Sequence, residues 1–431
     1  MSSSTRSLTA WLSDIEARHP KEIDLGLGRV RKVYDDLSLA EAMPKSVVVA
    51  GTNGKGSTVQ SLCNGLSALG LTVATYTSPH FHRFNERIRL GGQEVSDDEL
   101  VSAFERIEEV RGNTSLTYFE FSTLAAYVIF ADRASAGELD VAICEVGLGG
   151  RLDAVNVLDA DVSIVVSIGL DHQDWLGETV EKIAYEKAGV FRAGSVSLVG
   201  ESFPECVELA LRERGIDVQR YRRDFGLVER DGLVQSYNKA NSPVYFDAVA
   251  DSPLPANNLC LAMQASIALI ETRAEWKAIG HDFSLCAKAI SSTSVPGRLE
   301  FVDGEPPVLW DVAHNGAAAE CLSGHVESKF GTKNVIAVFS CLKDKDIHEI
   351  VSAMNTCVSS WYVAELDNSR ALPLSSIRSK LTEFDATFHS FDHLEAAYLA
   401  AQDYARKADA VLIVFGSFYV LEALRENARV E

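Results

Sequence analysis

The chain has 431 residues, of which 47% are hydrophobic and 23% are charged, and its formal net charge is −21 at pH 7. This length predicts two domains and leaves room for a third, and the composition is that of a water-soluble globular protein. The excess of acidic residues argues against nucleic acid or an anionic membrane surface as a partner. A phosphorylated small molecule would have to be held by local cations and metal.

The eight cysteines are scattered along the chain without a C-x-x-C pair, and several lie in apolar segments. We interpret them as reduced core residues of a cytoplasmic protein. Residues 1–18 contain no apolar run of signal-peptide length, and no stretch reaches the roughly 18 apolar residues of a membrane span. We therefore expect a cytoplasmic protein without a membrane partner.

At the N-terminus, the spacing of the apolar residues predicts an amphipathic helix over Leu8–Ala17. The segment 23–28 follows, and a second helix is predicted to end near Leu39. Only about 45 residues precede the first predicted strand, which is too few for a separate domain.

The segment Val47–Thr58, VVVAGTNGKGST, predicts a buried strand, a glycine-rich turn and a helix that starts near Ser57. Its glycines let the backbone turn tightly and approach a ligand. The helix start offers N–H groups and the positive end of its dipole to an anion. Lys55 adds a charge suited to the outer phosphates of a nucleotide, and Ser57 or Thr58 could support a magnesium ion.

This pattern departs from the standard phosphate-binding loop at two positions. Gly56 separates Lys55 from the hydroxyl residue, and Val49 stands where the standard loop begins with glycine. A glycine turn without a ligand is the alternative. We favour the nucleotide site because three glycines, a lysine and two hydroxyl residues at one strand-to-helix junction are more than packing requires.

The following 240 or so residues alternate between predicted strands and helices, which is typical of a mostly parallel sheet covered on both faces. Ligand-binding groups are expected at the C-terminal ends of such strands. Short alternating runs between about 221 and 245 indicate a small antiparallel patch. Strands are predicted over 72–77, 139–146, 161–168 and 195–199, and helices over 97–110, from about 121 to 134, over 179–188 and over 257–272.

Residues 291–297, SSTSVPG, are the best candidate for a linker. Beyond them, a second series of strands separated by helices predicts another, smaller α/β domain. We expect the active site in the cleft between the two domains. The strands of the second series are predicted near 308–312, 335–340, 360–365 and 410–415.

Two candidate ligands lie at the ends of successive predicted strands. Glu145 ends an otherwise apolar strand, where an ionised carboxylate is costly unless it is paired or bound to metal. It could bind magnesium beside the phosphate loop, and a salt bridge to Arg151 is the alternative. His172 follows the next strand and is either structural or a ligand; its position opposite Glu145 favours the ligand.

The remaining candidates are less specific. Lys187, on the residues alone, is typical of a solvated lysine. Asp311 ends a predicted strand and could accept hydrogen bonds from a ribose, while Arg298 could reach a phosphate. The alternatives for these two are an ion pair between domains and a helix cap. The run Lys343–Asp346 is more typical of a solvated loop.

Eight short motifs together resemble those of the folylpolyglutamate synthase/dihydrofolate synthase family, which belongs to the Mur-ligase-like superfamily. The set is highly specific, although no single motif is. It resembles most the bacterial bifunctional form, because IDLGL (23–27) and LTYFE (116–120) match segments where that form binds dihydropteroate. The motifs, which GSF (416–418) extends toward the C-terminus, are GTNGKGS (51–57), TSPH (77–80), NERI (85–88), EVGLGGRLDA (145–154), LDH (170–172), EKAG (186–189), PGR (296–298) and DVAHN (311–315).

The resemblance implies a P-loop, Mur-ligase-like ATPase domain with a mostly parallel sheet over 1–295, which would bind ATP and the pterin. A smaller Rossmann-like α/β domain over 296–431 would be the glutamate-ligase domain. The implied enzyme is an ATP-dependent ligase of folate biosynthesis. It would add L-glutamate to dihydropteroate, forming dihydrofolate, and to the terminal glutamate of reduced folates, through an acyl phosphate. Its partners would be these small molecules, and it would be a monomer.

The resemblance also implies roles for individual residues. Lys55, His172 and Lys187 would be catalytic, with Lys187 carbamylated at the second of two magnesium sites. Ser78 and Glu145 would bind one magnesium ion and His172 the other. The nucleotide would contact Thr52, Asn53, Gly54, Lys55, Gly56, Ser57, Asn258, Arg298, Asp311 and His314, with the match at Asn257–Asn258 ambiguous by one residue. The pteroate would contact Asp24, Leu25, Thr117, Tyr118, Phe119, Glu120, Leu152, Asp153 and Ala154.

Three other functions are weighed against this one. A cell-wall Mur ligase carries a nucleotide-sugar domain before its phosphate loop, for which the short N-terminal region leaves no room. A monofunctional folylpolyglutamate synthase would not use dihydropteroate as an acceptor. A nucleotide switch would carry a guanine-reading Asn-Lys-x-Asp, whereas Asn238–Asn241 lacks the final Asp.

Overall fold

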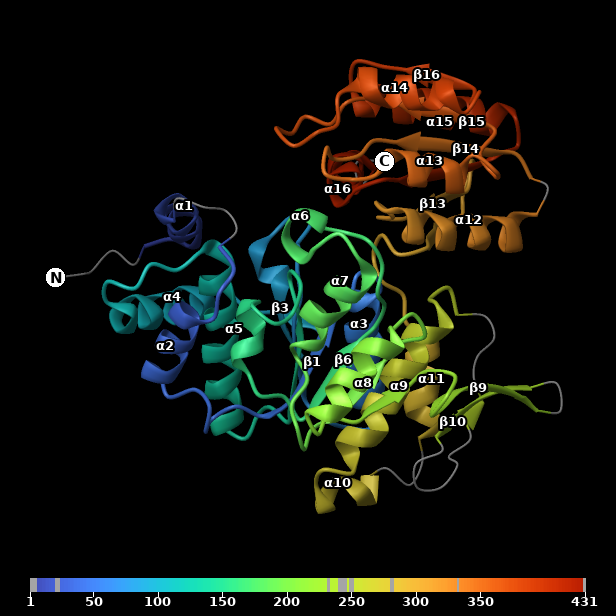
Figure 1. The fold of residues 1–431 in the computed structure, drawn as a ribbon. Coiled ribbons are helices and arrows are strands. Elements are labelled where there is room, and N and C mark those ends of the chain that lie inside the picture. Colours follow the sequence, from blue (N-terminus) through green and yellow to red (C-terminus); the bar gives the residue numbers. More distant parts are fainter. Residues whose placement is uncertain are drawn as a thin grey trace. The chain divides into compact units, whose positions relative to one another are not determined.

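The computed structural model describes residues 6–19, 24–230, 233–238, 246–247, 252–279, 283–331 and 333–428. These residues form two compact units (Figure 1). The first holds the chain up to Gly169 and Gln173–Thr293, and the second holds Leu170–His172 and the chain from Ser294 onward. Within the described ranges, none of the helices combines the length and the hydropathy needed to cross a bilayer.

The first unit is built on an eight-stranded sheet with the order β4-β3-β2-β5-β1-β6-β7-β8. From β2 to β8 in this order the strands are parallel, whereas β3 and β4 form an antiparallel extension. The strands are β1 Lys45–Ala50, β2 Val73–Tyr76, β3 Ile88–Leu90, β4 Gln93–Glu94, β5 Val141–Glu145, β6 Val162–Val165, β7 Val196–Val199 and β8 Val218–Arg220.

Strand β1 lies at the centre because both of its faces are apolar, as expected for a buried parallel strand. Val47 and Val49 belong to one hydrophobic cluster, and Val48 and Ala50 belong to the other. Val49 is level with Glu145 at the end of β5, and Ala50 with the last residue of β6. The segments that follow these three strands therefore leave the sheet at the same edge, where parallel sheets bind ligands.

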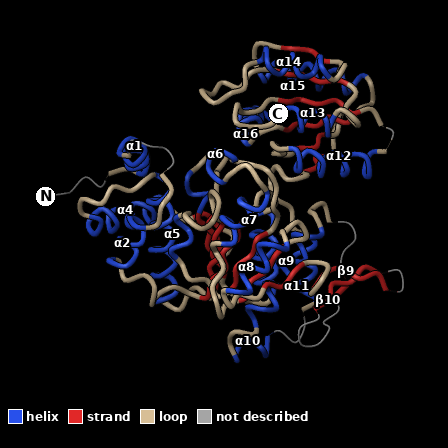
Figure 2. Tube along the Cα trace, viewed as in Figure 1, coloured by secondary structure: helices blue, strands red, loops and turns tan. Residues whose placement is uncertain are grey.

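Helices cover both faces of this sheet (Figure 2). Helices α3, α9 and α11 pack together on one face, and α1, α2, α4 and α5 contribute to the cluster on the other. The helices are α1 Leu8–Arg18, α2 Gly28–Asp36, α3 Lys55–Ala68, α4 Asp97–Arg111, α5 Tyr118–Ser135, α6 Gln173–Leu176, α7 Val180–Ala188, α8 Glu205–Glu213, α9 Ala256–Ile270, α10 Ala274–Ile279 and α11 Ser284–Ser291, with short 3₁₀ helices η1 Phe84–Arg87 and η2 Ala154–Val157.

A separate small sheet contains β9 Phe225–Arg230, β10 Leu233–Asn238 and β11 Phe246–Asp247, in the order β11-β10-β9. Both pairings are antiparallel, which confirms the antiparallel patch predicted here.

The second unit contains a six-stranded sheet with the order β12-β13-β17-β14-β15-β16. Only β12 is antiparallel to its neighbour. Phe339, Trp361 and Phe415 lie in the core, which helices α12 to α14 complete. The strands are β12 Glu300–Val302, β13 Val308–Trp310, β14 Val335–Phe339, β15 Ser360–Val363, β16 Phe388–Ser390 and β17 Val411–Phe415, and the helices are α12 Gly316–Phe330, α13 Ile347–Met354, α14 Leu374–Glu383, α15 Leu394–Lys407 and α16 Phe418–Ala428.

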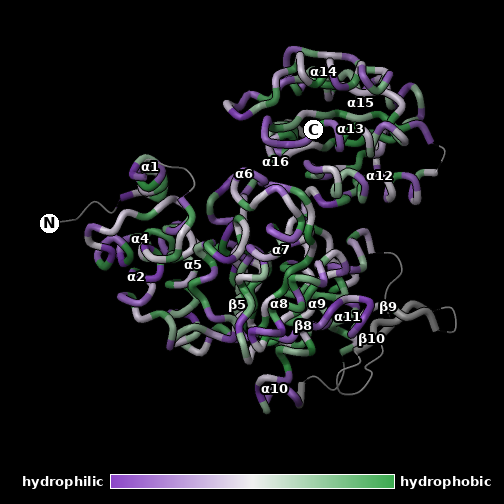
Figure 3. Tube along the Cα trace, in the orientation of Figure 1, coloured by the Kyte–Doolittle hydropathy of each residue, from purple (hydrophilic) through white to green (hydrophobic). Residues whose placement is uncertain are grey.

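Two mostly parallel sheets confirm the predicted fold class. Two helix starts were placed too late: α3 begins at Lys55 and α5 at Tyr118. The short edge strands β4, β12 and β16 were missed, because they are largely exposed and lack an apolar run. Figure 3 labels the central strand β5, which has such a run, and colours the chain by hydropathy.

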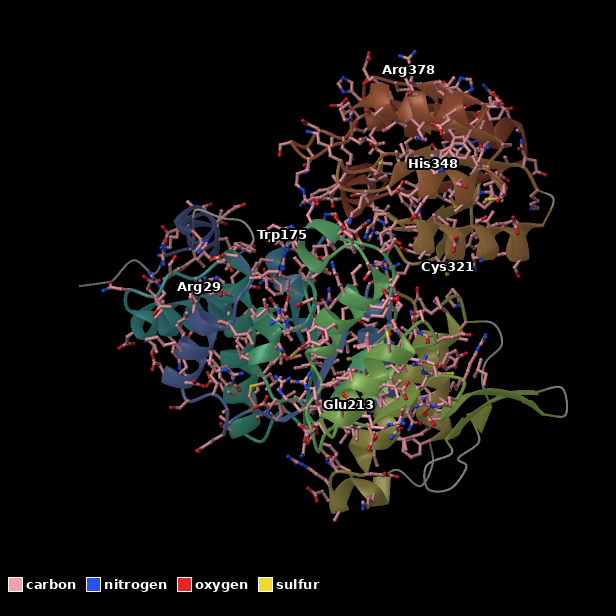
Figure 4. The ribbon with its side chains drawn as sticks, viewed as in Figure 1. Arg29, Trp175, Glu213, Cys321, His348 and Arg378 are labelled. Carbon is pink, nitrogen blue, oxygen red and sulfur yellow. The ribbon has the colours of Figure 1, made fainter. Side chains whose placement is uncertain are left out.

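The cysteines are all free thiols, as expected. The reading that they are core residues is wrong for Cys206 and Cys321, which are exposed. Figure 4 labels Cys321 on α12.

Candidate active site

The segment 51–57 between β1 and α3, here called the phosphate loop, is fixed by the chain that follows β6. The N–H of Thr52 donates to the carbonyl of Ser167 at 2.9 Å. The Ser167 hydroxyl accepts from the N–H of Asn53 and donates to the Asn53 carbonyl, both at 2.9 Å. The Thr52 hydroxyl likewise donates to the Gly169 carbonyl and accepts from the Gly169 N–H. The backbone of Thr52 and Asn53 is thus held in place before any ligand binds.

Gly54 is required at the helix start. It has the left-handed φ of +83°, and a Cβ there would lie 2.7 Å from Nδ2 of Asn258. Asn258 therefore lies directly against the phosphate loop. Asn257 turns elsewhere, since its Nδ2 donates to the Val166 carbonyl at 2.9 Å. The geometry favours Asn258 over Asn257 as the residue that faces a nucleotide.

Two lysines converge on one backbone carbonyl of the phosphate loop. Nζ of Lys55 lies 3.1 Å from the Gly51 carbonyl oxygen and 3.3 Å from that of Thr52. Nζ of Lys187, on α7, lies 3.1 Å from the same Gly51 oxygen. Lys187 is only 4% exposed, so the reading of it as a solvated lysine is wrong. Two lysine side chains thus meet at the loop, and Lys55 is placed to neutralise part of the charge of an anion.

Glu145 and Ser78 meet beside the phosphate loop. The backbone N–H of Ser78 lies 3.3 Å from Oε2 of Glu145, which is 6% exposed. A Cβ built on Gly56 would lie 3.7 Å from that same oxygen, so the carboxylate borders the first turn of α3. Arg151, the alternative partner of Glu145, instead pairs with Glu186.

The third predicted metal ligand, His172, is grouped with the second unit. Its side chain is 37% exposed, and its Nε2 lies 3.9 Å from Oδ2 of Asp171. In the described parts of the chain, no three His, Cys, Asp or Glu side chains form a group that could hold a metal ion. The metal role of His172 remains a prediction.

The predicted acceptor residues near the N-terminus and on α5 are joined by Arg29 of α2, a residue that Figure 4 labels. Arg29 donates to Oδ2 of Asp24 at 2.6 Å and to Oε1 of Glu120 at 3.1 Å. Glu120 in turn accepts from the N–H of Thr117, whose hydroxyl accepts from the N–H of Glu120. This capping box fixes the start of α5. Arg29 thus ties the segment at Asp24 to Glu120, which lies 91 residues beyond Arg29 in the chain.

The loop 147–154 reaches the same group. The carbonyl of Leu152 accepts from the N–H of Gly26 at 3.3 Å, next to Asp24 and Leu25. The ring of Phe119 lies so close to Gly147 that a Cβ there would be 2.6 Å from its Cζ. Residues from three of the predicted acceptor segments are therefore brought together.

Asp153 organises this loop from inside. Its carboxylate accepts from the N–H of Leu148 at 2.8 Å and of Val155 at 3.0 Å, and it caps η2, which begins at Ala154. Burial raises the pKa of Asp153 from 3.8 to about 6, although these backbone bonds and the charge of Lys55 act in the other direction. Asp153 thus forms part of the framework of the loop.

The TSPH turn is held by Arg87, whose carbonyl accepts from the N–H of Thr77 at 2.9 Å. Nε of Arg87 donates to Nδ1 of His80 at 2.7 Å, and its guanidinium lies 5.7 Å from the ring centre of Tyr118. Burial and the charge of Arg87 lower the pKa of His80 to about 4. His80 is therefore neutral near pH 7, with its proton on Nε2.

In the second unit, Asp311 immediately follows β13. Its two oxygens accept from the N–H groups of Leu299 and Ala313, both at 2.7 Å. Burial raises the pKa of Asp311, while the charge of Arg298 lowers it. The Arg298 guanidinium lies 5.2 Å from the ring centre of Phe418. The residues predicted to contact ATP here are thus supported by backbone and ring contacts.

Asp171, also grouped with the second unit, is surrounded by cationic and polar groups. Nζ of Lys345 lies 2.7 Å from Oδ1, Nδ2 of Asn315 lies 3.2 Å from Oδ2, and Nε2 of His314 lies 3.6 Å from Oδ2. Although burial raises it, the contact with His314 and the charges of Lys345 and His172 hold the pKa of Asp171 well below its usual range. The Lys345 side chain is 6% exposed, so the solvated-loop prediction for Lys343–Asp346 is wrong at Lys345.

The comparisons with known proteins agree with these motifs. Residues 297–418 match the family model described as Mur ligase, glutamate ligase domain. Over 424 residues the chain is 38% identical to the dihydrofolate synthase/folylpolyglutamate synthase of Escherichia coli (strain K12), covering 97% of this chain and 95% of that protein. The chain belongs to the dihydrofolate synthase/folylpolyglutamate synthase family. Its predicted class, an ATP-dependent acid–amino-acid ligase, is confirmed.

Solved structures of the dihydrofolate synthase/folylpolyglutamate synthase family are similar over the whole chain. E. coli FolC in complex with DHPP and ADP has a TM-score of 0.88 and 37% identity, covering 99% of both chains. The bifunctional enzyme from Yersinia pestis, complexed with AMPPNP and Mn ion, has a TM-score of 0.86 and 35% identity, covering 99% of this chain and 98% of that one.

Sequence reasoning missed three residues that support the loops of this dihydrofolate synthase/folylpolyglutamate synthase family member. Ser167 follows β6 without a chemical signature, and Arg29 resembles any charged residue of a surface helix. Arg87 stood in the NERI motif, yet nothing in the motif indicated that it would hold His80. Their roles become visible only in the folded chain, through the groups that they contact.

Proposed function

We propose that the protein joins L-glutamate to the carboxylate of dihydropteroate, forming dihydrofolate, and to the terminal glutamate of reduced folates, with hydrolysis of ATP to ADP and phosphate. The observation that carries this proposal is the acceptor region: Arg29 links Asp24 to Glu120, and Leu152 bonds Gly26, in the same unit as the phosphate loop. The family relationship supports it, since the matched relative from E. coli carries both activities in its name.

We assign residues 1–295 to ATP and the acceptor, and residues 296–431 to L-glutamate. The glutamate-ligase match over 297–418 supports the second assignment. In the first, the phosphate loop with Lys55 and Asn258 would hold the nucleotide, and the segments around Asp24, Thr117–Glu120 and Leu152–Ala154 would hold the pteroate. Arg298, Asp311 and His314 of the second unit would complete the nucleotide site. We also propose that the protein acts as a monomer.

A divalent metal fits the residues present. Ser78 supplies a hydroxyl and Glu145 a buried carboxylate beside the first turn of α3, and hard oxygen ligands of this kind suit magnesium. A magnesium ion there would neutralise phosphate charge and stabilise the charge that develops during transfer. We propose a second ion at His172. The relative from Y. pestis was solved with AMPPNP and Mn ion, which supports metal-bound nucleotide.

Lys187 is proposed to react with CO2 and form a carbamate, whose oxygens would serve the second ion. Its burial against the Gly51 carbonyl is the supporting observation, because burial disfavours an ammonium and favours reaction of the neutral amine. Protein equilibrated with 13C-bicarbonate should show a carbamate signal by NMR. A spectrum identical to that of Lys187→Arg would exclude the modification.

The reaction has two steps. An oxygen of the acceptor carboxylate attacks the γ-phosphorus of ATP, and the bond from that phosphorus to the β-phosphate oxygen breaks. The products of this step are ADP and an acyl phosphate. The neutral amine of L-glutamate then attacks the acyl carbon, phosphate departs, and the amide forms with loss of a proton. In the first step the protein's task is placement and charge neutralisation, for which Lys55 and Arg298 are suited.

One assay tests the proposal: ADP release with dihydropteroate or tetrahydrofolate, each with and without L-glutamate. We expect sustained release with either acceptor only when glutamate is present. Release with tetrahydrofolate alone would favour the monofunctional folylpolyglutamate synthase. Release that ignores glutamate would overturn the ligase assignment.

A further inference from the structure

The loop 147–154 rests on helix α7 through one ion pair to which no role has been given. Arg151 and Glu186 both stood in recognised motifs. Nη2 of Arg151 lies 2.8 Å from Oε1 of Glu186, and Nε lies 3.0 Å from Oε1 and 3.2 Å from Oε2. A guanidinium that meets both oxygens of a carboxylate fixes orientation as well as distance.

The backbones of the two segments are in close contact at the same place. The N–H of Arg151 donates to the carbonyl of Glu186 at 2.7 Å. A Cβ on Gly150 would lie 2.8 Å from the Lys187 carbonyl oxygen, so this position must be glycine. Nδ2 of Asn156 donates at 3.0 Å to the carbonyls of both Arg151 and Gly189, one from each segment.

Helix α7 is a rigid support for this contact. Ile183, Ala184 and Ala188 are in the core of the unit, and Lys187 is bound to the Gly51 carbonyl. On the loop side, Gly147 and Arg151 are exposed. Directly after Arg151 come Leu152, whose carbonyl bonds Gly26, and Asp153.

The energetic role of the pair is local. The side chains of Arg151 and Glu186 are 45% and 20% exposed, and Glu186 lines a hollow of about 420 Å³ together with residues of α6 and α8. Solvent-exposed ion pairs contribute little to global stability. A bidentate pair at the base of a binding loop can still set the conformation of that loop.

We propose that Arg151 and Glu186 are positioning residues. Their ion pair holds loop 147–154 against α7, the fixed base, in the conformation that binds the pterin-bearing acceptor. This inference rests on the proposed function, because it assigns the loop to the acceptor. It predicts a selective effect on acceptor binding. Nucleotide binding should be spared, because Lys187 holds α7 to the phosphate loop independently of the pair.

The test compares full-length wild type with Arg151→Gln, Glu186→Gln, the double variant and the exchanged pair Arg151→Glu/Glu186→Arg. Each single variant should raise the KM for dihydropteroate about ten-fold, leave the KM for ATP within about two-fold, and leave the Tm nearly unchanged. The KM of the double variant for dihydropteroate should be no higher than that of either single variant, because each single substitution already removes the same interaction. The exchanged pair should recover part of the loss.

Asp132→Asn is the matched control. Asp132 pairs with Arg106 at 2.8 Å in the same unit, and it is 62% exposed. Its removal should change neither KM.

An unchanged dihydropteroate KM in the single variants, or additive losses in the double variant, would overturn the inference. So would equal rises in both KM values with a fall in Tm, which would indicate a merely structural pair. If wild type accepts only tetrahydrofolate, the proposed use of dihydropteroate fails, and the same comparison is decided with tetrahydrofolate as the acceptor.

Discussion

The phosphate loop and the acceptor region are held in different ways within one unit. The phosphate loop is continuous in sequence, and its neighbours fix it through backbone groups and the Ser167 hydroxyl. The acceptor region is assembled from separate segments, which charged side chains such as Arg29 and Glu186 connect. A continuous loop fixed by backbone contacts can be recognised from its sequence, whereas a site assembled by side-chain pairs has to be seen folded.

The largest expected effect lies in the phosphate loop. Lys55→Ala removes a cation that neutralises phosphate charge, so we expect kcat for glutamate ligation to fall at least about 1,000-fold with the fold intact. The measurement is ADP release with dihydropteroate and glutamate, alongside circular dichroism. Lys182→Ala, an exposed lysine of α7, is the control and should keep full activity. Substantial ligation by Lys55→Ala would contradict its role.

A second substitution tests the shape of the same loop. Gly54→Ala would place a methyl group against Asn258 in a left-handed backbone, and we expect nucleotide affinity to fall about 100-fold. Calorimetry with AMPPNP measures it. Gly70→Ala is a matched control, because Gly70 has a similar φ of +86° and open space around it. It should cost about 1–2 kcal/mol of stability and no affinity. Equal affinity losses in both variants would point to backbone strain alone.

The acceptor region should respond selectively. Glu120→Gln removes the charge that holds Arg29, so we expect the KM for dihydropteroate to rise about ten-fold and the KM for ATP to stay unchanged. The chain offers a close control in Glu99→Gln. Glu99 forms the capping box of α4 with Ser96 and pairs with Arg133, as Glu120 does with Thr117 and Arg29, but away from the predicted site. If Glu99→Gln raises the acceptor KM as much, the effect is one of capping.

The last expected effect is on stability as a function of pH, and activity is not its readout. The pKa of Asp153 is raised from 3.8 to about 6 in the folded chain, so the folded state binds its proton more tightly than the unfolded state. The resulting stabilisation is complete below about 3.8 and is lost as pH rises through about 6, a change of roughly 3 kcal/mol. Urea unfolding at several pH values should show that Asp153→Asn removes this part of the dependence. Parallel curves for the two proteins would contradict the assignment.

Much of the fold could be predicted, because β1 and β5 contain continuous apolar runs and Ser96 is a strong helix cap. The phosphate loop followed from its glycines and Lys55. The burial of Lys187 and Lys345 could not be predicted, since a lysine becomes buried only when a distant partner, Gly51 or Asp171, meets it in the folded chain.

The central place of β1 has a consequence for motion. Both edges of this strand are paired, to β5 and β6, so its amide protons should be among the slowest in the molecule to exchange with deuterium. The phosphate loop is anchored to this protected strand, so it should lose little conformational entropy when a triphosphate binds. The ordering cost of that encounter would then fall on the acceptor segments, which come from separate parts of the chain.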